Sequence, residues 1–360
     1  MSSDNRTVKT LRLTVDPAHL ETPEARQALS QAAGILRAGG LVAFPTETVY
    51  GLGANALNST AVEKIFAAKQ RPAWDPVIVH IAGSDLGKAM LDVLVEQVAA
   101  PGRRLMKAFW PGPLTLLLPR SSAVPDVVTA GRPLVGVRMP AHPVAQELIR
   151  LAGVPVAAPS ANSFGHTSPT TADHVLEDLD GCIDAVLDAG PTNYGLESTV
   201  LDPCQSPMVI YRPGAVTIVQ IRDIAGPVET YQSAQPLLET PQSALPSPGV
   251  GLRHYAPRAR LILIEAPQAD LPARLAEAIL HFQQERVGVM APADLPFSTA
   301  GATIYPWGQW SNPDQLAHGL YAGLRALDAH GCTVILCPVP PEDGVGAAIR
   351  DRLRKAGIQE

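Results

Sequence analysis

The segment from residue 44 to residue 80 gathers side chains that can bind a small anion. It reads FPTETVYGLGANALNSTAVEKIFAAKQRPAWDPVIVH. An apolar run ends in a turn with proline, two threonines and two glycines, and Lys69 and Arg71 follow at the end of a short helix. His80 ends the next apolar run. Two cations on a turn that prolines stiffen, beside hydroxyl groups, are suited to hold phosphates.

These residues also have structural explanations. Lys69 can pair with the last carbonyl groups of its own helix. His80 can be a core histidine whose hydrogen bonds are satisfied. The pairing of both cations with the rigid proline turn, close to the hydroxyl-rich loop, favours a ligand site.

Two other segments place polar residues after apolar runs. Ser160 and Asn162 stand two apart in PSAN, so in an extended chain they share a face and can meet one ligand, unless they cap a loop. Arg138 is the lone cation of LVGVRMP. It needs a buried anionic partner or a ligand, unless it reaches solvent from an edge strand. Its planar fork suits a carboxylate.

Loops at strand ends collect ligands in α/β sheets. Ser198 opens the run STVLD, and Arg212 lies in YRPG at another strand end. The sequence shows no Ser–His–Asp order, no Walker A pattern and no H-E-x-x-H pattern. None of the four cysteines forms a C-x-x-C pair. We therefore expect no protein-bound metal and no activated nucleophile.

The elements that position these residues alternate between helices and strands. We expect a helix at 24–38, stopped by two glycines, and a second helix ending at Lys69, with Thr60 and Glu63 at capping-box spacing. Strands are predicted at 41–45, 77–81, 114–119, 134–140, 154–162, 185–190, 198–202 and 208–214. Helical patterns between several of them indicate an α/β domain, residues 1–212, around a twisted mixed sheet.

The remaining chain divides into a linker and a second domain. Residues 213–257 are rich in Pro, Gln and Ser and read as a long linker, whose end, SPGVGLRHYAP, can dock on a surface. Residues 258–360 predict a smaller α/β domain with Rossmann-like alternation, three strands and three helices.

Composition excludes several classes of protein. The 360 residues are 46% hydrophobic and 17% charged, which supports two cores, and the net charge of −6 argues against extended electrostatic binding of nucleic acid. No apolar stretch reaches the length of a membrane span, and the first residues lack the apolar core of a secretory signal. A cytoplasmic protein is expected.

Several motifs occur together in a specific order. They are PTETVYGLG, K-x-R-P followed by PVIVHI, FWPGPLTLLL, VGVRMPAHP, APSAN, ESTVLD and YRPG. Over residues of about 25–215 the chain thereby resembles the YrdC/Sua5 family of L-threonylcarbamoyladenylate synthases. SPGVGLRHYAP and VGAAIRDRLRKAG resemble the longer Sua5 form, which adds a linker and a second domain. The resemblance implies a YrdC-like twisted mixed sheet for the first domain.

The family makes threonylcarbamoyl-AMP and pyrophosphate from L-threonine, bicarbonate and ATP, for the t6A modification of tRNA. The resemblance implies ATP as a substrate with Mg²⁺, no tightly bound cofactor, other proteins of the t6A pathway as partners, and no strong direct tRNA binding.

The resemblance also implies roles for residues. The signature of the nucleotide site comprises Lys69, Arg71, Ser160 and Asn162. The residues in contact with ATP or its adenylate would be Arg71, Ser160, Ser168 and Arg212. The residues in contact with threonine would be Thr48, His80, Arg138 and Ser198, with Arg138 as the carboxylate partner.

Two further positions belong to the nucleotide side. Tyr255, in the docked linker, would close over the site, so that the linker acts as a lid. Asp75 stands where some relatives carry Asn or His. A carboxylate there would repel phosphates unless it faces water, pairs with Arg71 or helps to hold a cation.

Two other functions are open at this stage. One is an RNA-binding module, which would show a steep dependence of RNA affinity on salt. The other is an acyl hydrolase that uses Ser160 and Lys69 and forms a covalent acyl-enzyme.

Overall fold

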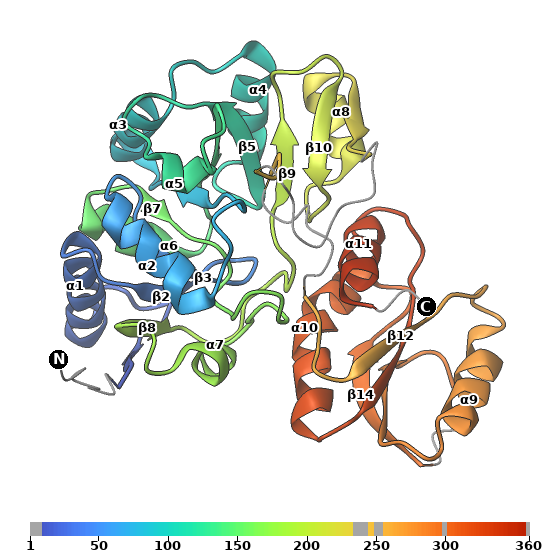
Figure 1. Ribbon diagram of the computed structural model, residues 1–360. Helices are drawn as coiled ribbons and strands as arrows, with labels where there is room; N and C mark the ends of the chain where they lie inside the picture. The colour runs from blue at the N-terminus through green and yellow to red at the C-terminus, as the bar shows by residue number, and fades with distance from the viewer. Residues whose placement is uncertain (1–8, 233–243, 248–254, 297–300, 358–360) are drawn as a thin grey trace.

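The computed structural model describes residues 9–232, 244–247, 255–296 and 301–357. It contains a large part, residues 9–232, and a smaller part that starts at residue 255 (Figure 1). The expected lid covers residues 233–243 and 248–254 among others, and these two stretches lie outside the described residues.

The large part is built on a mixed sheet, as the sequence predicts, and the described residues give this sheet eleven strands, three more than the eight predicted. Their spatial order is β1-β8-β2-β3-β7-β4-β6-β5-β9-β10-β11, with both parallel and antiparallel neighbours. The strands are β1 (Leu11–Thr14), β2 (Val42–Pro45), β3 (Tyr50–Asn55), β4 (Ile78–His80), β5 (Leu114–Pro119), β6 (Leu134–Arg138), β7 (Val156–Ala157), β8 (Ala185–Asp188), β9 (Thr199–Asp202), β10 (Met208–Arg212) and β11 (Val228–Thr230).

Helices pack on this sheet through apolar faces. The amphipathic helix expected at 24–38 is α1, which begins after the Thr22 cap and buries Leu29 and Leu36 completely. The helices of this part are α1 (Pro23–Arg37), α2 (Ser59–Lys69), α3 (Ser84–Leu94), α4 (Ala100–Phe109), α5 (Asp126–Thr129), α6 (Pro143–Ala152), α7 (Ala172–Leu179) and α8 (Ile218–Ala225).

Some local expectations were wrong. Asn58, not Thr60, caps α2, because its side chain accepts the Ala61 amide hydrogen bond. The two glycines assigned to a turn, Gly51 and Gly53, lie inside β3. A Cβ on Gly53 would come within 2.8 Å of Phe44 and 2.9 Å of Val156, so close packing requires glycine there.

The boundaries of two segments also differ. The strand expected at 154–162 ends at Ala157, so the chain that carries Ser160 and Asn162 is a loop. The expected linker begins with regular structure: α8 lies within it, and β11 pairs with β10 as the last strand of the large sheet.

The smaller part has four parallel strands in the order β12-β15-β13-β14, with helices between several of them. This confirms the expected alternation and adds β14, which the sequence reasoning did not assign. The elements are β12 (Arg260–Ile264), α9 (Leu271–His281), β13 (Val287–Pro292), β14 (Ala302–Gly308), α10 (Pro313–Ala329), β15 (Val334–Pro338) and α11 (Gly346–Ala356). All four cysteines are free thiols.

The two parts meet through α10 and α11, whereas α9 lies on the far side of the small sheet (Figure 1). Arg325 of α10 forms ion pairs with Glu177 and Asp178, and Arg352 of α11 forms one with Glu197. The pairs of Arg325 with Asp178 and of Arg352 with Glu197 are buried, so buried charges bind the second domain to the first.

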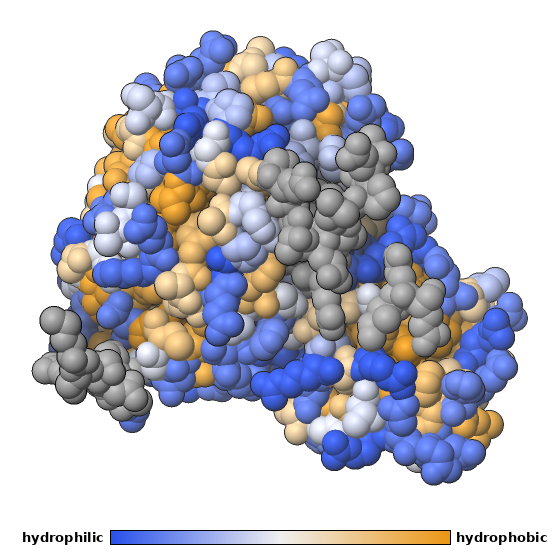
Figure 2. Space-filling model, in the orientation of Figure 1, coloured by the Kyte–Doolittle hydropathy of each residue, from blue (hydrophilic) through white to orange (hydrophobic). Residues whose placement is uncertain are grey.

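The face shown in Figure 2 mixes hydrophilic and hydrophobic residues over both parts. Within the described ranges, no helix combines the length and the hydropathy that crossing a membrane requires.

Candidate active site

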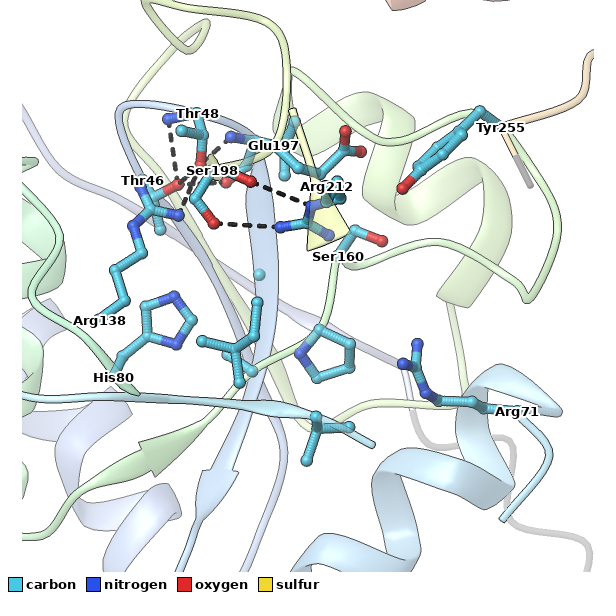
Figure 3. A pocket seen from close by; sticks show the side chains of 16 residues that line it. Thr46, Thr48, Arg71, His80, Arg138, Ser160, Glu197, Ser198, Arg212 and Tyr255 are labelled. Atoms are coloured by element: carbon cyan, nitrogen blue, oxygen red, sulfur yellow. Dashed lines mark hydrogen bonds between the residues drawn. The ribbon is translucent and has the colours of Figure 1, made fainter. Parts of the chain in front are cut away.

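Loops and strand ends of the large sheet surround one pocket (Figure 3). It brings together eight of the residues expected at a site, from segments that are far apart in the sequence, such as Thr48 and Tyr255. These are Thr48, Arg71, His80, Arg138, Ser160, Ser198, Arg212 and Tyr255. Its other lining residues are Thr46, Val49, Gly51, Val77, Ile78, Ala158, Pro159 and Glu197.

Arg138 forms one corner of the pocket. It lies on β6, an interior strand between β4 and β5, so it does not reach solvent as an edge-strand arginine would. Its Nη2 lies 2.6 Å from Glu47 Oε1, its Nη1 donates to Thr48 Oγ1 at 2.9 Å, and its Nε donates to the Gly112 carbonyl. Glu47 is therefore the buried anionic partner that this arginine requires.

The turn before β3 holds Thr48 in place. The hydroxyls of Thr46 and Thr48 are 2.8 Å apart, and Thr46 Oγ1 also donates to the Val49 carbonyl. Glu47 Oε2 accepts the Ala141 amide. The hydroxyls and Arg138 thus form a rigid polar corner.

His80 stands directly opposite Arg138 in the register of β4 and β6. Its ring meets Phe44 edge-on at 6.2 Å. Burial, and then the charge of Arg138, lower the pKa of His80 to about 3. The histidine is therefore neutral near pH 7 and can accept or donate one hydrogen bond at the pocket.

Arg212, at the end of β10, is fixed against the start of β9. Its Nε donates to the Ser198 carbonyl at 3.0 Å and its Nη2 to Ser198 Oγ at 3.1 Å. Thr115 Oγ1 lies 2.8 Å from the same Ser198 hydroxyl. The second cation of the pocket is thus held by neutral groups, and we expect its charge to remain available to an anion.

Arg71 lies at the opposite end of the pocket from Arg138 (Figure 3). Its Nη2 is 2.9 Å from Asp75 Oδ2, and its other bonds reach the Asp75 and Pro76 carbonyls. Of the arrangements considered for Asp75, the structure shows pairing with Arg71. Asp75 is fully buried and is not among the pocket-lining residues.

Lys69 and Asn162 are not among the residues that line the pocket. Lys69 Nζ donates to the Ser160 carbonyl at 2.6 Å and to the Asn162 carbonyl. It therefore pairs with the loop after β7 and not with its own helix. Burial, and then the charge of Arg71, lower the pKa of Lys69 well below its ordinary value.

The Asn162 side chain donates to the Ser163 and His166 carbonyls. The expectation that Ser160 and Asn162 share a face was wrong, because the strand alternation ends before them. Only Ser160 lines the pocket.

Ser168 is the remaining expected residue outside the lining. It is buried, and its hydroxyl donates to Glu197 Oε1. Glu197 itself lines the pocket and also accepts bonds from Tyr321 and Arg352. Burial raises the pKa of Glu197, but the charges of Arg352 and Arg212, together with the hydrogen bonds from Ser168 and Arg352, outweigh this effect and hold the pKa below its ordinary value.

Sequence reasoning assigned no role to Glu47 or Glu197. Signals for both were present: each is an acidic residue inside a motif rich in hydroxyls, PTETVYGLG or ESTVLD, and each chain segment leads into a buried strand. A buried arginine predicts a nearby carboxylate without showing which one it is.

The pocket suits two anionic ligands. Its side chains can bind and orient such ligands, and none of them is placed as a nucleophile with a base beside it. Its cations Arg71, Arg138 and Arg212 are spread along one cavity with hydroxyls between them. Lys69 cannot serve as a base for the Ser160 hydroxyl, because its Nζ donates to the Ser160 backbone carbonyl instead. In the described part of the chain, no three His, Cys, Asp or Glu residues cluster as metal ligands.

Comparisons with known proteins identify the family of both domains. The family model for Sua5, YciO and YrdC proteins, described as telomere recombination, matches residues 34–214. The model described as the threonylcarbamoyl-AMP synthase C-terminal domain matches residues 216–357.

Relatives match over nearly the whole chain. The threonylcarbamoyl-AMP synthase of Pyrococcus abyssi is 43% identical over 327 residues, which cover 90% of this chain and 92% of that protein. The Bacillus subtilis threonylcarbamoyl-AMP synthase is 43% identical over 353 residues, covering 97% and 98%. The crystal structure of P. abyssi Sua5 complexed with L-threonine superposes with a TM-score of 0.87 at 40% identity, covering 96% of this chain and 97% of that one. The chain therefore belongs to the Sua5/YciO/YrdC family, in the form that carries the threonylcarbamoyl-AMP synthase C-terminal domain.

Proposed function

We propose that this protein is an L-threonylcarbamoyladenylate synthase, which makes threonylcarbamoyl-AMP and pyrophosphate from L-threonine, bicarbonate and ATP. The observation that carries the proposal is the placement of Arg138 and Arg71 at opposite ends of one pocket, with Arg212 and hydroxyl groups between them. This arrangement fits a carboxylate at one end and phosphates at the other. Relatives that match 90% or more of this chain carry this activity in their names.

The corner of Arg138 is the proposed threonine subsite. An arginine has five N–H donors, and Glu47, Thr48 and Gly112 engage three nitrogens through one contact each. One N–H on each terminal nitrogen is left for a bidentate bond to the threonine carboxylate. Thr48, neutral His80 and Ser198 would surround the rest of the amino acid.

The end formed by Arg71, Ser160, Arg212 and Tyr255 is the proposed ATP subsite. Arg71 and Arg212 offer charge to the phosphates, and the Tyr255 ring offers an aromatic wall. We assign Lys69, Asn162, Asp75 and Ser168 to the support of this subsite, because each bonds to a residue or loop that lines it.

The chemistry requires no covalent intermediate with the protein. The threonine amine combines with bicarbonate and loses water to form a carbamate. A carbamate oxygen then attacks the α-phosphorus of ATP, and the bond to pyrophosphate breaks. Positioning of the two reactants can lower such a barrier by about 7–11 kcal/mol. The fixed arginines stabilise the charge that develops on the phosphates.

Magnesium fits this site as a companion of ATP. Glu197 is the carboxylate among the described lining residues, and Ser168, Tyr321 and Arg352 already occupy it. The donor set thus suits an ion held mainly by ATP phosphates and water rather than by a protein cage. Such an ion would neutralise phosphate charge.

Neither alternative function gains support. The Lys69 contacts described above leave Ser160 without a base for acyl transfer. The net charge of −6 disfavours extended RNA binding. We propose that the product passes in the cytoplasm to proteins of the t6A pathway, which act on tRNA.

The experiment for this proposal is pyrophosphate release by the purified full-length protein with ATP, with threonine and bicarbonate added singly and together. Release that needs both supports the proposal. Equal release when either is omitted overturns it.

A further inference from the structure

Glu197 lies in the pocket wall and is held by residues of both domains. Its carboxylate accepts bonds from Ser168 of the first domain, from the Tyr321 hydroxyl at 2.9 Å and from Arg352 Nε at 2.8 Å. Arg352 is 1% exposed and Tyr321 is fully buried. Two side chains of the second domain thus complete the hydrogen bonding of a pocket residue.

The same two side chains hold Tyr255. The Arg352 guanidinium lies over the Tyr255 ring at 5.2 Å, and the Tyr321 ring stacks on it with centroids 5.8 Å apart and an angle of 28°. Tyr255 has a φ of 67°, in the left-handed region that a bulky residue rarely adopts. A conformation of this kind persists where surrounding contacts determine it.

A displaced Glu197 would also disturb its neighbour. Ser198 follows directly, and its carbonyl and hydroxyl hold Arg212. The contacts therefore run from α10 and α11 to Glu197 and Tyr255, and from Glu197 through Ser198 to Arg212. Glu197, Tyr255 and Arg212 all line the pocket, and Tyr255 and Arg212 belong to the proposed ATP subsite.

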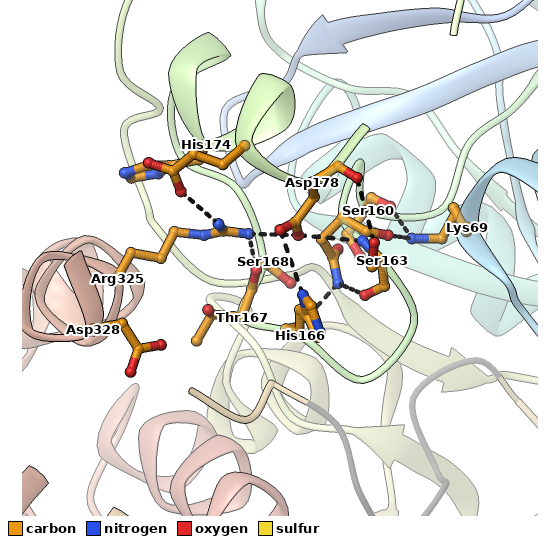
Figure 4. A network of polar contacts seen from close by, with 12 residues as sticks. Lys69, Ser160, Ser163, His166, Thr167, Ser168, His174, Asp178, Arg325 and Asp328 are labelled. Carbon is orange, nitrogen blue, oxygen red and sulfur yellow. Dashed lines mark hydrogen bonds and ion pairs between the residues drawn. The ribbon is translucent and has the colours of Figure 1, made fainter. Parts of the chain in front are cut away.

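A second interdomain contact supports the loop on the same side (Figure 4). Arg325 of α10 donates to the Thr167 carbonyl at 2.6 Å and to Asp178 Oδ2 at 2.9 Å. Asp178 in turn accepts the Ser163 amide. The second domain thereby binds the loop between Ser160 and Ser168 directly at Thr167 and, through Asp178, at Ser163.

We propose that Arg352 and Tyr321 are positioning residues for the ATP half of the pocket, so that the second domain is a structural part of the active site. The inference rests on the proposed function for the identity of the ligand as ATP. Neither residue lines the pocket; they act through Glu197 and Tyr255. Arg138 makes no contact with either residue among the described interactions, and Ser198 is the proposed threonine contact that these interactions reach. The threonine side should therefore be affected less than the ATP side.

The test measures ATP binding by calorimetry and the KM values for ATP and threonine in full-length variants. Arg352→Met should weaken ATP binding about tenfold or more, since it leaves a buried carboxylate without its charge partner. Tyr321→Phe should weaken it about threefold or more while keeping the stacked ring. The threonine KM should rise clearly less than the ATP KM in both, because only Ser198 links these contacts to the proposed threonine subsite.

Arg352→Lys and Arg350→Met are the matched comparisons. Arg352→Lys keeps a cation beside Glu197 and should recover part of the lost ATP affinity. Arg350 lies on the same helix but bonds to the Pro340 carbonyl and Glu265 inside the second domain. Arg350→Met should bind ATP like the wild type. Circular dichroism melting establishes which variants are folded.

Wild-type ATP affinity in folded Arg352→Met and Tyr321→Phe overturns the inference. Equal losses in Arg350→Met, or equal rises of the ATP and threonine KM values, also overturn it, because they indicate general destabilisation. If Arg352→Met does not fold, the ATP affinities of Tyr321→Phe and Arg352→Lys test the inference in its place. If the wild type binds ATP but releases no pyrophosphate in response to threonine, the proposed function is contradicted. The ATP affinities of the variants still test whether Arg352 and Tyr321 position the pocket.

Discussion

The carboxylate of Glu47 lies 2.6 Å from the guanidinium of Arg138, and both side chains are almost completely buried. The two residues are 91 positions apart, on the turn before β3 and on β6. A buried pair of this kind fixes the direction of the arginine fork, and it leaves a costly uncompensated charge if either partner is removed. The proposed threonine subsite depends on this pair.

Arg138→Ala should raise the threonine KM about 100-fold and change the ATP KM much less, because a bidentate bond to the substrate carboxylate is lost. Initial-rate kinetics with each substrate varied in turn measure this. Arg138→Lys keeps the positive charge but lacks the planar fork, so its threonine KM should lie between those of the wild type and Arg138→Ala. A larger effect on ATP than on threonine would assign this corner to the nucleotide.

Glu47→Gln should lower the free energy of unfolding by about 3 kcal/mol and raise the threonine KM, since Arg138 loses its buried partner. Urea denaturation measures the stability change. The control is Glu147→Gln, which breaks the surface pair with Arg150 and should cost less than about 1 kcal/mol. Similar costs for the two variants would show that the buried pair is energetically unimportant.

Lys69→Met should destabilise the protein by about 2 kcal/mol, because two carbonyl groups of the loop after β7 lose their donor. ATP binding should weaken as a consequence of the disturbed loop. Thermal unfolding and ATP calorimetry on the same sample separate the two effects. Loss of ATP binding at unchanged stability would instead show that Lys69 contacts the phosphates directly.

The stability of the protein should depend on pH through His80. Its pKa is about 3 in the folded protein, against 6.5 ordinarily, so below pH 6.5 the unfolded chain takes up a proton that the folded chain excludes. This contribution is fully present above pH 6.5 and falls by about 1.4 kcal/mol per pH unit as the pH drops toward 3. Urea unfolding at pH 7.5 and 5.0 should show a loss about 2 kcal/mol larger in the wild type than in His80→Gln. Equal losses in both proteins would show that His80 is not held neutral.

Much of this fold could be predicted because its elements have local signals. The spacing of Ala28, Leu29, Ala32 and Leu36 defines α1, and apolar runs define β2, β4, β5 and β6. Gly51 and Gly53 concealed β3, since glycine is usual in turns and its need for close packing appears only once Phe44 and Val156 are placed beside it.

The sequence predicts which residue types line the pocket, but it does not predict which residues contact one another there. Arg138 required an anion, yet only the folded register identifies Glu47. Lys69 has the same sequence signal whether it faces a phosphate or a carbonyl, and the loop after β7 decides between them. The ion pair of Arg352 with Glu197 joins two residues that are 155 positions apart and lie in different domains. No periodicity in either segment predicts this contact.

The most direct test of the central claim is the substrate requirement for pyrophosphate release by the full-length protein. With ATP present, release should be at background with threonine alone or bicarbonate alone. Both together should give rapid release, with threonylcarbamoyl-AMP formed in equal amount by mass spectrometry. Release that is the same without threonine or without bicarbonate would contradict the proposal that this pocket joins the two to AMP.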